Sequence, residues 1–146
     1  MKDRLYLDSN IFIYSAEKHT EFDKALRQLN RDIATGVIEA VTSELTLSEV
    51  LVKPFADNDV AKIEIYKRSL RNGEALTITP VDRSVLIEAA SVRAFNNLKL
   101  PDAIHFATAL LNNCTHLLTN DDHFKSMKNH YKINILPLQQ LHLFLN

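Results

Sequence analysis

The sequence predicts an α/β fold: a single domain over residues 1–146 with a central, mostly parallel sheet of four or five strands, flanked by helices on both faces. The chain has 146 residues, which is the size of one compact domain. Short β-like runs alternate along it with longer helical segments. Strands separated by helices need crossover connections, and such connections join parallel strands of a sheet that is covered on both faces.

The predicted strands are short runs of apolar and β-compatible residues that end at polar or turn-forming residues. The first of them ends at Asp8, Ser9 and Asn10, the second is the weakest, and the last precedes an apolar tail. The strands are expected at residues 4–7, 37–41, 76–79, 115–118 and 133–136.

The predicted helices rest on apolar residues that recur at helical spacing and on residues that start or stop a helix. The helices are expected at residues 11–16, 21–34, 43–52, 57–71, 82–95 and 101–111. The residues expected to begin helices are Thr42 or Ser43, Asp82 and Pro101, and those expected to end them are Gly36, Pro54 and Gly73.

Composition excludes several classes of function. The 17 Lys and Arg against 18 Asp and Glu give a net charge of −1, so the protein does not grip nucleic acid by bulk charge. Its 2 glycines stand apart, which rules out a glycine-rich phosphate loop. The single cysteine, Cys114, allows neither an internal disulfide nor a thiolate zinc site and indicates a reducing compartment. Since no apolar run reaches the roughly 18 residues that span a bilayer and the start shows no secretion signal, we expect a cytoplasmic protein without membrane contact.

Acidic residues follow two of the predicted strands, at the strand ends where open parallel sheets bind ligands. Asp8 closes the first strand, and Asp121 and Asp122 follow the strand that ends at Leu118. Each has a structural interpretation as well, because Asp8 is a suitable helix cap and the Asp121–Asp122 pair is typical of a turn. For any one of these residues taken alone, the structural interpretation is favoured.

Two further acids and a histidine lie on predicted helices. Glu49 has apolar residues on both sides of its helix, which predicts either a buried carboxylate with a partner or a metal, or a partly exposed one at a pocket rim. Asp102 begins a helix whose composition predicts packing nearly all round, although an acid there also complements the helix dipole. His105 lies one turn after Asp102, and a core histidine or one that supports the site is the favoured interpretation.

Taken together, four separated acidic positions without a cysteine set or a histidine pair suit a hard divalent cation, Mg²⁺ or Mn²⁺. Carboxylates packed together repel one another, whereas around an ion they can activate water and stabilise charge on a phosphoryl oxygen. That chemistry needs no nucleophilic side chain. None is indicated, because Ser9, Ser43 and Ser48 lie in no nucleophile-elbow motif.

Four segments carry a family resemblance. In chain order they are Leu5-Tyr6-Leu7-Asp8-Ser9-Asn10-Ile11-Phe12-Ile13-Tyr14, Thr42-Ser43-Glu44-Leu45-Thr46-Leu47-Ser48-Glu49, Leu100-Pro101-Asp102-Ala103-Ile104-His105-Phe106-Ala107-Thr108-Ala109 and Leu117-Leu118-Thr119-Asn120-Asp121-Asp122-His123-Phe124. In these segments and in their order the sequence resembles the PIN-domain nucleases, and specifically the VapC-like toxins of bacterial toxin–antitoxin pairs.

The resemblance implies a PIN-like fold and a Mg²⁺- or Mn²⁺-dependent endoribonuclease that hydrolyses RNA phosphodiester bonds. The family's catalytic and metal-binding acids map onto Asp8, Glu49, Asp102 and Asp121, with Asp8 and Asp102 as the principal ligands. Asn10 or Thr119 would give polar support, Asp122 is an alternative to Asp121, and Glu44 is an alternative placement to Glu49. The resemblance also implies a homodimer silenced by a small antitoxin protein, and the near-neutral charge favours a narrow RNA target such as a tRNA or rRNA loop.

Three alternatives stay open beside the toxin. One is a PIN-type nuclease in RNA processing without a toxin role, and another is a non-catalytic interaction domain. The third is a phosphatase of the haloacid dehalogenase type, which also begins with a strand followed by Asp. That chemistry needs a second acid two residues after the nucleophile, where this chain has Asn10, so it is the weakest of the three.

Overall fold

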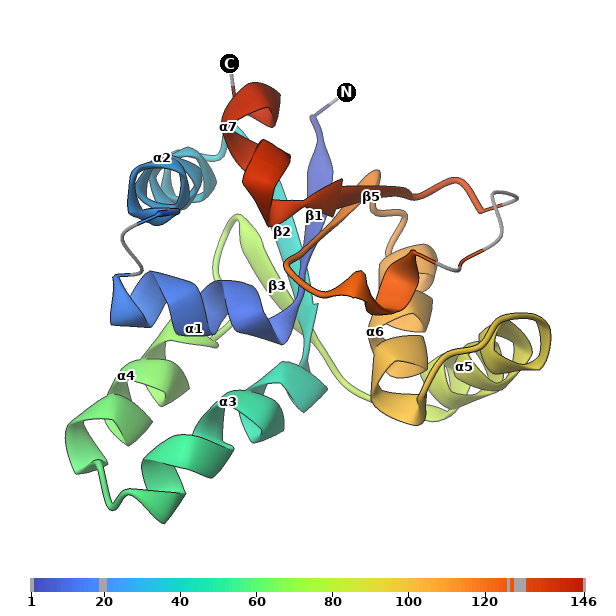
Figure 1. Ribbon diagram of the computed structural model, residues 1–146, viewed down its shortest axis with the longest axis horizontal. Helices are drawn as coiled ribbons and strands as arrows, with labels where there is room; N and C mark the ends of the chain where they lie inside the picture. Colours follow the sequence, from blue (N-terminus) through green and yellow to red (C-terminus); the bar gives the residue numbers. More distant parts are fainter. Residues whose placement is uncertain (1, 19–20, 126, 128–130, 146) are drawn as a thin grey trace.

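The computed structural model describes residues 2–18, 21–125, 127 and 131–145. In these residues five parallel strands form one sheet in the order β3-β2-β1-β4-β5 (Figure 1). The strands are β1 (Arg4–Leu7), β2 (Glu39–Ser43), β3 (Leu76–Thr79), β4 (His116–Thr119) and β5 (Asn134–Pro137). The predicted α/β class and parallel sheet are confirmed.

The first strand occupies the centre of the sheet. Tyr6 pairs with Val41 of β2 on one side and with Leu117 of β4 on the other. The chain leaves β1 toward β2 and returns later to β4, so the strand order reverses at β1. Ligands of open parallel sheets bind at such a reversal, beyond the carboxyl ends of the strands.

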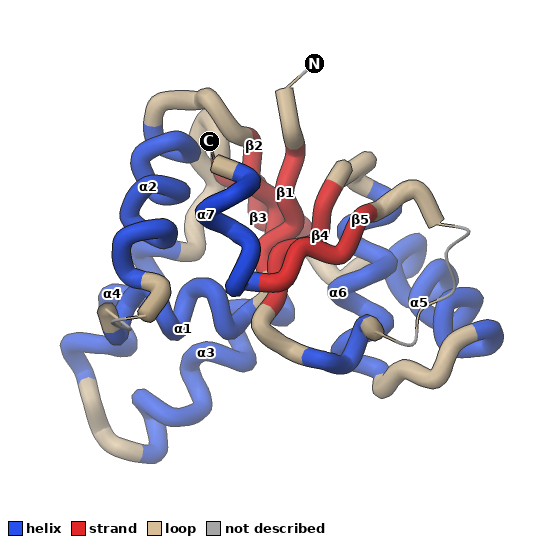
Figure 2. Tube along the Cα trace, turned by 45° about the horizontal axis from the view of Figure 1, so that its top comes forward, coloured by secondary structure: helices blue, strands red, loops and turns tan. Residues whose placement is uncertain are grey.

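Helices cover both faces of the sheet, and Figures 1 and 2 show the resulting layers. On one face lie α1 (Ser9–Glu17), α2 (Asp23–Ala34) and α7 (Leu141–Phe144), and on the other lie α5 (Arg83–Phe95) and α6 (Leu100–Leu111). A helical pair, α3 (Glu44–Ala56) and α4 (Val60–Ser69), extends from the carboxyl end of β2 and packs beside α1. Two short 3₁₀ turns, η1 (Asp122–Phe124) and η2 (Leu138–Gln140), follow β4 and β5.

The alternation of side chains along β1 divides the core between the two faces. Leu5 and Leu7 pack with Leu26 of α2, whereas Tyr6 packs with Phe106 of α6 on the opposite face. All residues of α6 from 103 to 109 are buried, so the predicted packing nearly all round this helix is confirmed. Among the described residues, no helix combines the length and the apolar character that crossing a membrane requires.

Several predicted helix ends are confirmed by their hydrogen bonds. Asp82 Oδ1 accepts from the Val85 amide at 3.0 Å and caps α5. Of the two candidates for α3, Ser43 is the cap, because its Oγ accepts from the Leu45 amide at 3.0 Å. Gly36, at φ 77°, ends α2 in the left-handed conformation that favours glycine.

Other predicted boundaries are wrong by a few residues. The prediction that Pro54 ends its helix fails because α3 continues to Ala56, and the Asp57 amide still reaches the Lys53 carbonyl at 2.9 Å. A proline removes only its own amide and crowds the preceding turn, so a helix can close two residues later. The next helix is shorter than residues 57–71, because Asp59 Oδ1 caps it through the Lys62 amide at 3.1 Å.

Strand boundaries shift in the same way. The second strand lies two residues beyond 37–41, because the amides of Val37 and Ile38 both donate to the Asp32 carbonyl and close α2 instead. The strands expected at 115–118 and 133–136 each begin and end one residue later, and the helix expected at 11–16 extends over Ser9–Glu17.

Candidate functional site

Asp8 lies at the carboxyl end of the central strand and is only 3% exposed. Its Oδ1 accepts from the Ser9 amide at 2.8 Å, so it caps α1, as the structural interpretation expected. Its Oδ2 accepts from Thr119 Oγ1 at 2.6 Å, and its own amide donates to the Leu118 carbonyl at 3.0 Å. These bonds tie the carboxylate to the end of β4, so the cap also lies where the carboxyl ends of β1 and β4 meet.

Thr119 joins Asp8 to Asp121. The Thr119 hydroxyl donates to Asp8 and also accepts from the Asp121 amide at 3.0 Å. The Asp121 side chain is 41% exposed, whereas that of Asp122 is 83% exposed and pairs with Lys125 Nζ at 3.0 Å. Of the two adjacent acids, Asp121 is therefore the one beside Asp8.

Glu49 reaches the same crevice from α3. Its Oε1 lies 2.6 Å from His105 Nε2, and the Glu49 side chain is 32% exposed. The expectation that its helix is buried on both sides is wrong, because Val52 is 68% exposed on the solvent side. Of the two interpretations of Glu49, the partly exposed carboxylate at a rim is the one found. Glu44 is an exposed residue at the start of the helix.

Asp102 enters from the first turn of α6. Its side chain is 14% exposed, and its Oδ2 lies 3.0 Å from His123 Nδ1. The same His123 nitrogen lies 3.8 Å from Asp121 Oδ2, so one imidazole contacts acids from α6 and from the segment after β4. On the other side of the crevice, His105 Nε2 lies 3.9 Å from Asp8 Oδ1. Two histidines thus link the four acids in pairs.

The pKa shifts agree with this convergence. Burial raises the pKa of the Asp121 carboxyl, and repulsion from Asp8 raises it further. His123 lowers that pKa, while Asp102 and Glu49 add to the rise. The pKa of His123 is raised by its hydrogen bond to Asp102 and by the negative charges of Asp102, Asp121 and Asp8. Acids from four distant segments therefore feel one another's charge.

The donor chemistry of the crevice fits a hard divalent cation. Among the residues that the structure describes, no three His, Cys, Asp or Glu side chains already form a ligand set for a metal ion. The acids nevertheless supply carboxylate oxygens, which Mg²⁺ and Mn²⁺ prefer. Two residues after Asp8, the buried Oδ1 of Asn10 has no hydrogen-bond partner within the described residues. An acceptor without a donor suits a water molecule or a cation.

Sequence reasoning missed two residues that contact the acids or their partners. His123 directly follows Asp121 and Asp122, and a histidine in an acidic turn could have been singled out as a counter-charge. Tyr6 is buried on β1, and its hydroxyl lies 2.5 Å from His105 Nδ1. A tyrosine within a buried strand needs a partner for its hydroxyl, but the sequence does not indicate which one.

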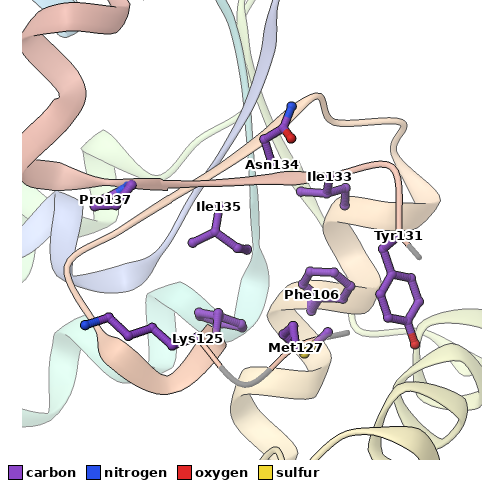
Figure 3. A pocket seen from close by; sticks show the side chains of 9 residues that line it. Phe106, Lys125, Met127, Tyr131, Ile133, Asn134, Ile135 and Pro137 are labelled. Carbon is purple, nitrogen blue, oxygen red and sulfur yellow. The ribbon is translucent and has the colours of Figure 1, made fainter. Parts of the chain in front are cut away.

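A separate cavity of about 530 Å³ lies between α6 and β5 (Figure 3). Ile133, Ile135, Phe106 and Tyr131 line it together with Lys125, and none of the four acids does. Most of its described lining residues are apolar, and none of them is a carboxylate, a histidine or a cysteine that could bind a metal ion. The cluster of four acids at the carboxyl ends of β1 and β4 remains the candidate site.

Comparison with known proteins places this geometry in a family. No curated protein matches the chain, but the family model of the PIN domain matches residues 5–129. A toxin–antitoxin complex from Klebsiella pneumoniae matches with a TM-score of 0.63 at 21% identity, over 88% of this chain and 94% of that one.

Two further structures are similar over most of their length. VapBC2 from Rickettsia felis, bound to a promoter DNA fragment, has a TM-score of 0.63 at 17% identity and coverages of 92% and 98%. VapBC-5 from Mycobacterium tuberculosis has a TM-score of 0.61 at 22% identity, again with coverages of 92% and 98%. At these identities the likeness concerns the fold, whereas the family model covers most of the sequence. The chain belongs to the PIN domain family.

Proposed function

We propose that the protein is a Mg²⁺- or Mn²⁺-dependent endoribonuclease that acts in the cytoplasm as the toxin of a toxin–antitoxin pair. One observation carries the proposal. In a member of the PIN domain family, four acids from distant parts of the chain meet at two histidines. His105 Nε2 lies 2.6 Å from Glu49 and 3.9 Å from Asp8, and His123 Nδ1 lies 3.0 Å from Asp102 and 3.8 Å from Asp121. Ionised carboxylates repel one another, so such a cluster is costly unless it serves a cation.

In this proposal Asp8 and Asp102 are the principal metal ligands, and Glu49 and Asp121 complete the site. When bound, the ion would activate water and stabilise negative charge on a phosphoryl oxygen. The surrounding residues hold the acids in place: Ser9 and Thr119 fix both oxygens of Asp8, and Thr119 also fixes the backbone of Asp121. Asn10 offers its unpaired Oδ1 as a further acceptor close to Asp8 in sequence.

The proposed partners follow from the relatives and from the charge. The similar structures are described as toxin–antitoxin or VapBC complexes, which supports a small antitoxin as a partner of this chain too. A homodimer is proposed on the family resemblance. The net charge of −1 argues against tight binding to bulk RNA, so we propose a tRNA or rRNA loop as the target. A map of cleavage ends in total RNA tests this, and scattered ends without a preferred site would refute a narrow target.

Replacing Asp102 by asparagine tests the metal-dependent activity. Asp102→Asn keeps the shape of the side chain and removes its charge, so we expect RNA cleavage with Mn²⁺ to fall by more than about 100-fold, beyond the loss typical of residues that only support a metal ligand. Circular dichroism should show an unchanged fold.

The matched control is Asp122→Asn. It makes the same chemical change at an acid whose side chain is 83% exposed and paired with Lys125, and it should cut RNA like the parent. Cleavage by Asp102→Asn at the parental rate would show that the assignment of the site is wrong.

A further inference from the structure

We infer that Tyr6 and His105 form a buried positioning pair that orients the Glu49 carboxylate toward the metal site. The inference rests on the proposed function, since it gives these two residues a task in metal binding. Neither is proposed as a metal ligand. The Tyr6 hydroxyl contacts His105, and His105 in turn contacts Glu49.

The contacts run from the buried Tyr6 through His105 to Glu49, one of the four acids. The Tyr6 hydroxyl lies 2.5 Å from His105 Nδ1, and the opposite ring nitrogen, Nε2, lies 2.6 Å from Glu49 Oε1. Tyr6 and His105 are 0% and 1% exposed, and their rings meet edge to face at 61°. The imidazole is therefore held at both nitrogens, and it holds only one of the two oxygens of Glu49.

The chemistry of these groups sets the direction of the hydrogen bonds. An ionised carboxylate can only accept, so His105 Nε2 carries the proton that it donates to Glu49. In the neutral imidazole Nδ1 is then an acceptor, and the Tyr6 hydroxyl donates to it. The hydroxyls of Thr42 and Thr46 beside the phenol do not compete as donors, because Thr42 donates to the Leu7 carbonyl at 2.8 Å and Thr46 to Thr42 at 2.7 Å. The Tyr6 hydroxyl thus holds the imidazole at the nitrogen opposite the one that holds Glu49.

The surroundings argue that the pair is present for this contact and not for packing. His105 is the one ionisable residue in the fully buried stretch 103–109 of α6, between Ile104 and Phe106. A buried polar group costs free energy unless it is hydrogen-bonded, and an apolar residue would pack here at no such cost. Because Glu49 is 32% exposed, nothing but His105 is seen to fix its carboxylate among the described residues. Side chains that orient a metal ligand in this way contribute about 10- to 100-fold to metal affinity or activity.

The experiment measures Mn²⁺ affinity by titration, together with the tautomer of His105 by ¹⁵N NMR of the imidazole nitrogens without metal. Tyr6→Phe keeps the ring and removes the hydroxyl; we expect Mn²⁺ to bind about 10-fold more weakly and the ¹⁵N resonance of His105 Nδ1 to shift, because that nitrogen loses its hydrogen bond. Tyr66→Phe is the matched control, because Tyr66 is 2% exposed but packs in a different cluster around α4 and β3. It should leave both readouts unchanged.

Two variants of His105 separate positioning from packing. In His105→Gln the amide nitrogen takes the place of Nε2 and can still donate to Glu49, so affinity should stay within about 3-fold of the wild type, below the loss expected of a missing support. In His105→Asn the amide takes the place of Nδ1 and cannot reach Glu49, so affinity should fall as in Tyr6→Phe. Adding Tyr6→Phe to His105→Gln should change little, because Tyr6 acts through the imidazole.

The outcomes are distinct. Wild-type affinity in Tyr6→Phe, or equal losses in His105→Gln and His105→Asn, overturns the positioning pair and leaves the proposed nuclease standing. Absence of Mn²⁺ binding by the wild type overturns the metal site of the proposed function, and the inference falls with it. Binding by the wild type, weakened in Tyr6→Phe and His105→Asn and retained in His105→Gln, supports both.

Discussion

Replacing Asp121 by asparagine is expected to have opposite effects on thermal stability with and without metal. Burial and the charges of Asp8, Asp102 and Glu49 raise the pKa of the Asp121 carboxyl, and the attraction of His123 offsets only part of the rise. A carboxyl with a raised pKa in the folded state is destabilising once it is ionised, so above that pKa the wild type carries a cost that Asp121→Asn removes. Below the pKa that Asp121 has in the unfolded chain, its carboxyl is protonated in both the folded and the unfolded state. The difference in stability between the wild type and Asp121→Asn then vanishes.

The magnitude follows from the exposure of the side chain. Asp121 is 41% exposed, so solvent screens much of the repulsion, and a gain of about 0.5–1 kcal/mol is expected in the metal-free variant at pH 7. For a domain of this size each kcal/mol raises the Tm by about 2–4 °C, which predicts a rise of about 1–4 °C. With Mn²⁺ at about 100 times its Kd, the wild type gains about 2.7 kcal/mol from binding. A variant that lacks one of the proposed ligands should lose most of that gain.

The assay is a pair of melting curves for each protein, one with EDTA and one with Mn²⁺. We expect Asp121→Asn to melt above the wild type with EDTA and below it with Mn²⁺. Asp122→Asn removes a neighbouring charge that pairs with Lys125 at the surface, and it should follow the wild type in both conditions. A metal-free Asp121→Asn that melts below the wild type at pH 7 would refute the repulsion among the acids.

Two further predictions concern the side chains that hold the acids. The pKa of His123 is raised by Asp102, so its protonated form stabilises the metal-free fold below about pH 6.5, and this contribution disappears as the pH rises through the raised pKa. His123→Ala should therefore melt at a lower temperature than the wild type at pH 6, by a few degrees at most because the ring is 53% exposed. At pH 9 the two proteins should melt at the same temperature. A difference that grows with pH would contradict this. Thr119→Val keeps the shape of a residue that is 1% exposed, but it removes the donor to Asp8 and the acceptor for the Asp121 amide. Urea titration should therefore show that the free energy of unfolding falls by about 1–3 kcal/mol. Thr77→Val, at an exposed position of β3, is the control, and equal stability of the two variants would mean that the Thr119 bonds are not needed.

Sequence patterns predicted the fold well because the alternation of strands and helices reports which faces are buried. The apolar run of α6 predicted its burial, and caps such as Asp82 marked helix starts because short polar side chains bond to free amides. Boundaries were less predictable. Whether Val37 begins a strand or closes α2 depends on its bond to the Asp32 carbonyl, and that choice is made by the tertiary structure. Tertiary structure also decides where the helix that contains Pro54 ends, since α3 continues past the proline to Ala56.

The proximity of the proposed site residues was predictable from the sequence, and the contacts that connect them were less so. Asp8 and Asp121 follow neighbouring parallel strands, so topology alone brings them together once the sheet is known. Which of Asp121 and Asp122 faces the crevice could not be read from two adjacent identical residues; the hydroxyl of Thr119 decides it by holding the Asp121 amide. The contact between Tyr6 and His105 joins residues 99 positions apart, and no local pattern encodes such a pairing.

The partners of the four acids explain how the fold tolerates them. Asp8 accepts two hydrogen bonds, from an amide and a hydroxyl, and these bonds compensate the burial of its carboxyl group at 3% exposure. Glu49 and Asp102 each have one oxygen against a histidine ring nitrogen, which supplies a hydrogen-bond donor. The two histidines differ in how firmly they are held. The His105 ring is hydrogen-bonded at both nitrogens in the core, whereas the His123 ring is half exposed and can move away from Asp102. We therefore expect metal binding to keep the contact between His105 and Glu49 and to displace His123 from Asp102.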